Sequence, residues 1–227
     1  LQGMHGAAQT KRKARERGIR PLFGAVLTTS LERGAPGADA LVLARDREGF
    51  AAVSRLVTAR RLERDFSLPA ALTAEAVRAA ESFFVLSADS GLLRELASAL
   101  PAGMLYAELC HDGAEGAAAR LRNTAALAAE LSVPLAATGG VFFARPEDHG
   151  LHCLLRAMDL GRATGSLRND ECAPAGAFLA SAAEMEQRLA AWPGALANTA
   201  RLASECRVEL PGGGMIFPEF RLPDGES

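Results

Sequence analysis

Three adjacent residues whose side chains can bind transition metals, Cys110, His111 and Asp112, follow a short apolar run of the chain. A thiolate, an imidazole and a carboxylate could together hold a zinc ion. Adjacent side chains project in different directions, however, and zinc ligands are usually spaced more widely. Asp112 and Glu115 also have the spacing of a capping box. We therefore favour a structural role, in which Asp112 caps a helix and Cys110 ends a strand in the core.

The other candidate motifs offer weaker evidence of chemistry. His149 and His152 are three residues apart, which on a helix places both on one face, but no His-Glu-x-x-His zinc motif is present. We favour a helix surface bordering a core for this pair. His5 lies in a glycine-flanked stretch and could face a cleft. The basic run at 11–17 is interpreted as a solvated helix face rather than a nucleic-acid contact.

The elements that must position these side chains alternate between short apolar runs and helical patterns. Runs of strand length cover residues 19–27, 40–44, 83–86, 104–109 and 133–138. Helices are predicted at 7–17, from 46, at 73–80, 89–100 and 112–131, from 146, from 181 and at 195–206. Parallel strands need helical crossovers, so this order predicts a mainly parallel α/β sheet with helices outside. Ligands in such folds gather at the C-terminal ends of the strands.

The composition is that of a globular protein, with 227 residues, 49% hydrophobic and 23% charged. A net charge of −2 weakens the case for a basic nucleic-acid module without excluding it. No apolar run approaches the roughly 20 residues of a membrane span, and we expect a cytoplasmic protein. The four cysteines, Cys110, Cys153, Cys172 and Cys206, form no CxxC pair, so we expect reduced thiols.

The predicted core consists of apolar residues at strand and inner-helix positions: Leu41, Val42, Leu43, Phe84, Val85, Leu86, Leu105, Leu109, Leu135 and Leu154. Residues 1–206 are expected to form one domain. Residues 207–227 lack periodicity and are predicted to form a linker. Because Leu1 is not an initiator methionine and the last residues are polar, we expect both ends to be cut from a longer protein.

Several segments, in order, resemble one family. Residues 18–27 (Gly-Ile-Arg-Pro-Leu-Phe-Gly-Ala-Val-Leu) resemble a Gly-Ile-x-Pro-x-x-Gly-x-Glu-hydrophobic segment. That segment belongs to the polymerase and histidinol phosphatase (PHP) domain of the bacterial DNA polymerase III alpha subunit. Further similar segments lie at 43–50, 56–58, 105–109, 134–138, 144–148, 151–152, 195–199, 217–220 and 223–227. The resemblance covers nearly the whole chain.

The resemblance implies a distorted (β/α)₇ TIM-like barrel that lacks its first βα unit here. In active members, histidines and carboxylates at the strand ends bind a trinuclear metal cluster that activates water against a phosphoester. The first ligands of that cluster would lie before Leu1. Val26 stands at the position of the family glutamate, and Gly140 and Phe142 replace an aspartate and a histidine. Asp112 stands where another histidine aligns.

The resemblance therefore implies a degenerate, metal-free PHP domain with no catalytic residues. Its expected role is structural, supporting the polymerase module of the same chain, with DNA and a proofreading exonuclease subunit as further partners. The parent would be a DNA-directed DNA polymerase, a nucleotidyltransferase of DNA replication. The alternative is an active phosphoesterase or 3'-5' exonuclease that holds zinc, manganese or magnesium through His5, Glu108, His111 and Asp112. A third interpretation is a free-standing interaction module with no polymerase attached.

Overall fold

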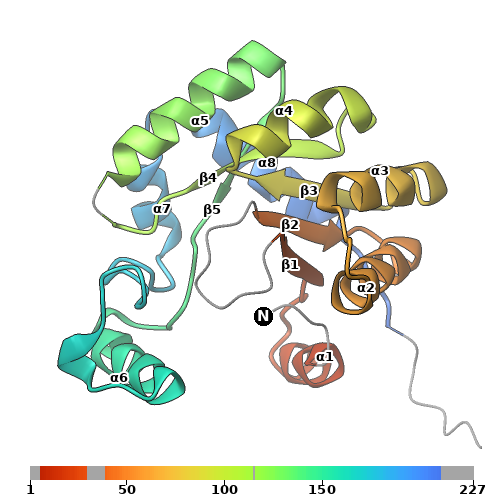
Figure 1. Ribbon diagram of the computed structural model, residues 1–227. Helices are drawn as coiled ribbons and strands as arrows, with labels where there is room; N and C mark the ends of the chain where they lie inside the picture. Colours follow the sequence, from red (N-terminus) through yellow and green to blue (C-terminus); the bar gives the residue numbers. More distant parts are fainter. Residues whose placement is uncertain (1–5, 30–38, 115, 211–227) are drawn as a thin grey trace, which may run out of the picture.

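The computed structural model describes residues 6–29, 39–114 and 116–210. These contain one five-stranded sheet with the strand order β1-β2-β3-β4-β5 (Figure 1). The strands are β1 (Gly24–Thr28), β2 (Asp39–Ala44), β3 (Phe83–Ser87), β4 (Leu105–Cys110) and β5 (Leu135–Thr138). The longer helices are α1 (Ala7–Glu16), α2 (Arg47–Leu62), α3 (Leu68–Arg78), α4 (Ser90–Ala99), α5 (Ala117–Leu131), α6 (His149–Leu160), α7 (Ala182–Arg188) and α8 (Pro193–Glu205). Two 3₁₀ turns, η1 (Pro146–Asp148) and η2 (Thr164–Ser166), flank α6.

The direction of β2 separates the observed sheet from the predicted one. Strands β3, β4 and β5 are parallel, whereas β2 runs antiparallel to both β1 and β3. The mixed α/β class is confirmed, but a mainly parallel sheet is wrong for the β1–β2–β3 half. In the described residues the sheet is open, so the barrel implied by the resemblance is not confirmed.

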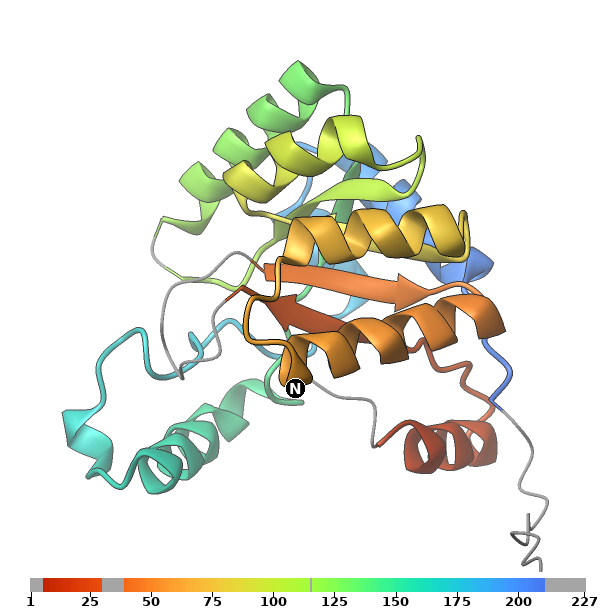
Figure 2. The same ribbon diagram turned by 45° about the vertical axis from the view of Figure 1, so that its right-hand side comes forward.

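Helices cover both faces of the sheet, and the alternation of side chains along β3 explains how. Val85 joins the core beneath α2, α3 and α4, whereas Phe84 and Leu86 point to the opposite face and pack with Tyr106 and Leu202 of α8. Figure 2 shows α2 to α5 together on one side of the sheet. Every residue of β3 is buried, as its continuous apolar run predicts.

Helix α8 closes the outer edge of β5, where another strand would otherwise pair. The Thr199 hydroxyl accepts from the Ala137 N–H at 2.8 Å, and its single proton lies within reach of two carbonyls, those of Ala137 at 2.8 Å and Ala195 at 2.9 Å. The Asn198 side-chain amide donates to the Leu135 carbonyl at 2.8 Å. Side chains of a helix thus satisfy the polar groups of an edge strand.

Helix α6 lies apart from the sheet in both views (Figures 1 and 2). Only Ala157 of this helix is buried, and Leu154 is 47% exposed, so the prediction of Leu154 as a core residue is wrong. The apolar spacing of α6 predicted burial, but the helix packs beside its own following loop. Of the remaining predicted core residues, six are buried (Val42, Phe84, Val85, Leu86, Leu105 and Leu109) and three pack partly buried against the core (Leu41, Leu43 and Leu135).

The two ends of the described chain meet near α1. This helix buries none of its residues, and the Lys11 ammonium donates to the Leu210 carbonyl at 2.8 Å. The Arg207 N–H donates to the Arg45 carbonyl at 2.6 Å, so the predicted linker begins against the sheet. Its remainder, 211–227, lies outside the described residues. None of the helices that the structure describes is suited to cross a bilayer.

Candidate functional site

The register of the sheet brings the predicted site residues to one face. Val26 pairs with Leu41, Leu41 with Leu86, and Leu86 with Tyr106. Laterally paired residues share a face, and so do residues two apart along a strand, so Glu108 lies on the same face as Val26. Val26, which the resemblance predicts to stand at the position of a family carboxylate, is 40% exposed and offers only methyl groups.

Glu108 is the carboxylate built into this face. Its Oε1 accepts a hydrogen bond of 2.6 Å from the Thr138 hydroxyl on the neighbouring strand. Burial raises the pKa of Glu108, opposed by the hydrogen bond from Thr138, while the charge of Asp39 raises it further.

A pocket of about 560 Å³ opens beside the ends of β3 and β4, lined in part by Asp89, Glu108, Cys110, Asp112 and Arg120. Two of its carboxylates are already engaged. Asp89 caps α4, accepting from the Leu92 N–H at 2.8 Å. Asp112 is paired with the Arg120 guanidinium at 3.0 Å. Two of the carboxylates of this pocket therefore already have a partner, and in the Asp112–Arg120 pair both members line the pocket.

The predicted capping box of Asp112 is wrong. Helix α5 begins at Ala117, and its N-cap residue is Gly116, in the left-handed conformation with φ +75°. The Asp112 carboxylate instead accepts from the Ala114 N–H at 3.1 Å and binds Arg120. This short turn and the ion pair outcompete capping because they satisfy the carboxylate before the helix begins. Glu115, the other half of the predicted box, lies outside the described residues.

Gly140 follows β5 with φ +55°, in the left-handed region that favours glycine. A Cβ added here would lie 2.6 Å from the Cys110 Sγ and 3.7 Å from the Asp112 Cβ. Gly140, which the resemblance predicts to replace a family aspartate, therefore has no room for a side chain while Cys110 stays in place. Burial raises the pKa of the Cys110 thiol, so this sulfur is held as the neutral thiol.

Segment 176–179 crosses the exit of β5, where Phe142 and Phe143 lie. The Phe142 N–H donates to the Ala177 carbonyl at 2.9 Å, and the Leu179 N–H donates to the Phe143 carbonyl at 3.1 Å. Phe142 is 67% exposed, and its ring lies 5.7 Å from that of His152. The phenyl ring carries no ligand atom, and the resemblance predicts that it replaces a family histidine.

His111 contributes an unsatisfied atom to the strand ends. Its Nδ1 is buried and has no hydrogen-bond partner among the described residues, while its carbonyl accepts from Arg188 at 3.4 Å. In the alternative metal site, Glu108 and Asp112 line one pocket, where Glu108 accepts from Thr138 and Asp112 pairs with Arg120. His5 lies outside the described residues.

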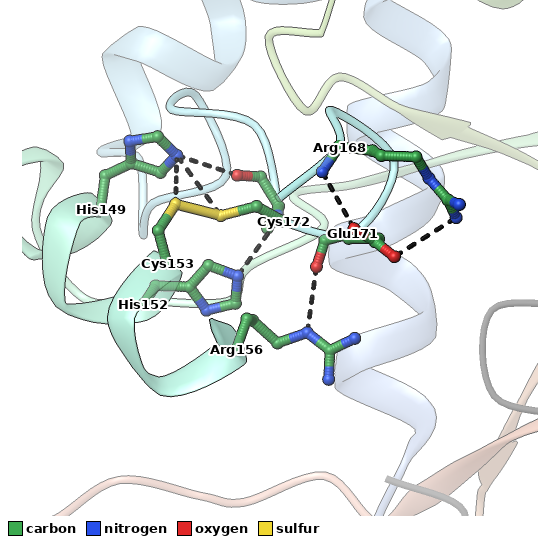
Figure 3. Close-up of a disulfide and its surroundings, with 8 residues drawn as sticks. His149, His152, Cys153, Arg156, Arg168, Glu171 and Cys172 are labelled. Carbon is green, nitrogen blue, oxygen red and sulfur yellow. Dashed lines mark hydrogen bonds and ion pairs between the residues drawn. A yellow bond between two sulfur atoms is a disulfide. The ribbon is translucent and has the colours of Figure 1, made fainter. Parts of the chain in front are cut away.

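A second cluster, not predicted from the sequence, joins α6 to the loop before α7 (Figure 3). Cys153 and Cys172 form a disulfide, so the prediction of four reduced thiols is wrong for this pair, whereas Cys110 and Cys206 are free. The His149 Nε2 lies 3.5 Å from the Cys153 Sγ and 3.9 Å from the Cys172 Sγ. The pair escaped prediction because 19 residues separate the cysteines. The available signal was His149 and Cys153, four apart on one helix face.

The histidines also hold the backbone next to Cys172. The His152 Nε2 accepts from the Ala173 N–H at 3.1 Å, and the His149 Nε2 lies 3.0 Å from the Ala173 carbonyl. Both rings therefore face the same loop, as their spacing predicts. Among the described residues, His149, Cys153 and Cys172 are the group of metal-binding types whose ligand atoms lie close enough to share an ion.

Curated relatives match this chain over most of its length. An error-prone DNA polymerase of Nocardia farcinica is 31% identical over 216 residues, covering 84% of this chain and 19% of the relative. A DNA polymerase III subunit alpha of Pseudomonas aeruginosa is 28% identical over 227 residues, covering 92% and 19%. An error-prone DNA polymerase of Mycobacterium tuberculosis is 31% identical over 253 residues, covering 99% and 23%.

These homologues are DNA polymerases. They are DNA polymerase III alpha subunits or error-prone DNA polymerases, which confirms the predicted similarity of this sequence to that group. The chain spans about a fifth of the length of these relatives. No protein-family model matches the chain.

Proposed function

We propose that this chain is the degenerate PHP domain of a bacterial DNA polymerase of the III alpha or error-prone type, and that it does not hydrolyse phosphoesters. Its role is to support the polymerase module of the same polypeptide during DNA replication in the cytoplasm. The observation that carries the proposal is the match over 84% or more of the chain to polymerases several times its length.

The strand ends support the absence of hydrolysis because their groups do not suit a metal cluster. A divalent ion needs several deprotonated ligands with free lone pairs. Here one family position is a valine, and Gly140 has no space for a carboxylate beside Cys110. Glu108 has a raised pKa and accepts from Thr138, while Asp112 is paired with Arg120. No hydrolytic step is therefore derived for this site.

The supporting role agrees with where the buried surface lies. Both faces of the sheet are packed, and α8 satisfies the edge of β5, so the sheet forms a rigid unit without a continuing strand at that edge. A domain of this kind offers a polymerase module a fixed surface. DNA and a proofreading subunit are partners of the parent enzyme in this proposal.

The alternative, an active metal-dependent phosphoesterase, draws on one observation. The buried Nδ1 of His111 has no partner among the described residues, as expected of a ligand whose metal is missing. One imidazole nitrogen supplies only a quarter of a tetrahedral shell, and its neighbours Glu108 and Asp112 are engaged. The supporting role therefore accounts for more of the site.

Reading the gene on either side of these 227 residues tests the attachment to a polymerase. The proposal predicts an open reading frame that continues for several hundred residues and encodes the acidic residues of a polymerase active site. A frame that encodes this domain alone would contradict it and favour a free-standing interaction module.

A further inference from the structure

Four side chains of α6 and the following loop form a cluster that does not line the pocket beside β3 and β4: His149, His152, Cys153 and Cys172. We propose that in the reduced chain His149, Cys153 and Cys172 bind one zinc ion. The zinc ion and the disulfide are then alternative cross-links between α6 and the loop that carries Cys172. The proposal is independent of the supporting role, because none of these residues stands at a position of the family cluster.

The separations between the ligand atoms suit zinc. With Zn–S bonds of about 2.3 Å and a Zn–N bond of about 2.0 Å, a tetrahedral ion places nitrogen and sulfur about 3.5 Å apart. The His149 Nε2 lies 3.5 Å from one sulfur and 3.9 Å from the other. Zinc capture thus requires the two sulfurs to separate and the Ala173 carbonyl, which lies 3.0 Å from the His149 Nε2, to leave that position. Two thiolates and an imidazole favour zinc over magnesium or manganese, which prefer oxygen.

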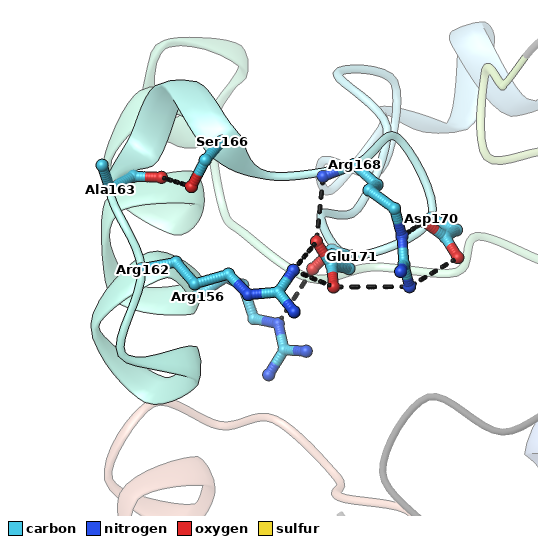
Figure 4. Close-up of polar contacts among 7 residues, drawn as sticks. All are labelled: Arg156, Arg162, Ala163, Ser166, Arg168, Asp170 and Glu171. Atoms are coloured by element: carbon cyan, nitrogen blue, oxygen red, sulfur yellow. Dashed lines mark hydrogen bonds and ion pairs between the residues drawn. The ribbon is translucent and has the colours of Figure 1, made fainter.

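The loop that carries Cys172 is fixed by its neighbours (Figure 4). The Glu171 carboxylate is 12% exposed and accepts from the Arg162 guanidinium at 2.8 Å and the Arg168 N–H at 2.9 Å. Its backbone carbonyl accepts from the Arg156 Nε at 3.1 Å, which ties the loop to α6. These bonds do not involve sulfur, so they hold Cys172 opposite Cys153 after the disulfide is reduced.

The fourth coordination position faces solvent. A pocket of about 680 Å³ is lined by His149, Cys153, Cys172 and Ala173, together with Gly113 of the β4 exit. A water molecule from this pocket would complete the tetrahedron. His152 is a positioning residue, because its Nε2 holds the Ala173 N–H beside the ligands.

The exchange between the two states balances. A dithiol reductant breaks the Cys153–Cys172 bond, each sulfur gains one electron and one proton, and the reductant leaves as its own disulfide. Zinc then displaces both thiol protons to solvent. His149 gives up its Nε2 proton, which is bonded to the Ala173 carbonyl in the disulfide state, and takes up a proton at Nδ1.

The cross-link at Cys172 affects the strand ends because the chain that follows Cys172 packs against the exit of β4. Gly176 packs against Gly113 so closely that a Cβ on Gly113 would lie 2.8 Å from the Gly176 Cα. The Arg188 guanidinium donates to the Gly176 carbonyl at 3.2 Å and to the His111 carbonyl at 3.4 Å. Zinc or the disulfide therefore anchors the segment that covers the exits of β4 and β5.

Zinc titration of the chain in its two redox states tests the proposal. The chain is reduced with dithiothreitol, desalted without oxygen, and titrated against a chromophoric chelator. We expect one zinc per reduced chain and none at the cluster in the oxidised chain, which keeps two titratable thiols after denaturation. A reduced chain that binds no zinc, or an oxidised chain that binds it equally well, would overturn the proposal.

Single variants locate the site. Cys153→Ser, Cys172→Ser and His149→Ala should each weaken zinc binding by about 100-fold or more, and His152→Ala by about tenfold. Cys110→Ser, which alters a strand-end thiol, is the matched control and should leave binding unchanged. Cobalt bound to the reduced chain should show a sulfur-to-cobalt charge-transfer band that Cys172→Ser weakens. Loss of binding in Cys110→Ser, with the cluster variants unaffected, would place the metal elsewhere; circular dichroism verifies that each variant folds.

Discussion

At the scale of single residues, Gly140 decides what the end of β5 can hold. Its φ of +55° disfavours a side chain, and its closeness to Cys110 leaves no space for one. We predict that Gly140→Ala destabilises the chain by about 2–4 kcal/mol, part from the left-handed backbone and part from overpacking against sulfur. Urea unfolding measures this difference.

Two companion variants separate these causes. In a Cys110→Ala background the cost of Gly140→Ala should fall to about 1–2 kcal/mol, because the steric part is removed. Gly165→Ala is the control, since nothing lies within 4 Å of its added Cβ, and it should change stability by less than about 0.5 kcal/mol. Equal effects at the two glycines would contradict the crowding described here.

Glu108 gives the strand ends a pH dependence. Burial raises its folded pKa, so its contribution to stability is complete below the unfolded pKa and is lost as pH rises through the folded pKa. We predict that Glu108→Gln, which cannot ionise and still accepts from Thr138, is more stable than the parent at pH 7. The difference should shrink towards pH 4, as measured by thermal unfolding across this range.

Glu130→Gln is the control of opposite sign. The hydrogen bond from Arg94 lowers the pKa of exposed Glu130, so its contribution is present above the unfolded pKa and is lost as pH falls. Removing its charge should lower stability slightly at pH 7 and have no effect at low pH. A Glu108→Gln curve that follows the Glu130→Gln curve would show that Glu108 is not destabilised by burial.

At the scale of elements, the contact between α8 and β5 closes the β5 edge of the sheet. Thr199→Val keeps the shape of the side chain but leaves the Ala137 N–H without its acceptor and removes the proton within reach of the Ala137 and Ala195 carbonyls. We predict a loss of about 2–4 kcal/mol in the free energy of unfolding for Thr199→Val and less than about 1 kcal/mol for Thr199→Ser. The exposed Thr58→Val on α2 is the control, and a similar loss there would argue against the edge contact.

The attachment of α6 to the following loop depends on the disulfide or the zinc ion, because only Ala157 of this helix is buried. Closing a 19-residue separation contributes about 3 kcal/mol in the chain-entropy model. We predict that reduction with a chelator present accelerates amide hydrogen exchange in α6 and in 173–178, while β3 and β4 stay protected. Zinc added after reduction should restore the slow exchange. If amide exchange accelerated equally across the sheet, the cross-link would stabilise the whole domain instead of α6 alone.

Local signals predicted elements well where the deciding contacts are themselves local. Asp46 caps α2 through the Gly49 N–H, and Ser181 and Glu184 form the predicted capping box of α7. The prediction failed at Asp112, where an arginine eight residues away takes the carboxylate. It also failed at α6, whose apolar spacing gives no information about which surface it meets. The Cys153–Cys172 pair depends on how the loop folds back, which no spacing in the sequence encodes.

At the scale of the whole molecule, the family resemblance predicts the site positions, and the structure shows the surroundings of these residues. The register places Val26 and Glu108 on one face, and Gly140 lies against Cys110. The direction of β2 and the open sheet could not be predicted from alternating elements, because alternation fixes neither strand direction nor closure. The strand ends and the proposed zinc site lie in different parts of the molecule, so the supporting role and zinc binding can be tested separately.

The measurement that tests the account most directly is metal-stimulated hydrolysis of a phosphodiester, bis(p-nitrophenyl) phosphate, by the chain with manganese or magnesium. These ions prefer oxygen ligands, so the cysteine cluster does not complicate the assay. A degenerate site should release nitrophenol no faster than buffer with the same ion, and His111→Ala should leave this rate unchanged. Metal-dependent turnover that disappears in His111→Ala would contradict the account and establish an active phosphoesterase.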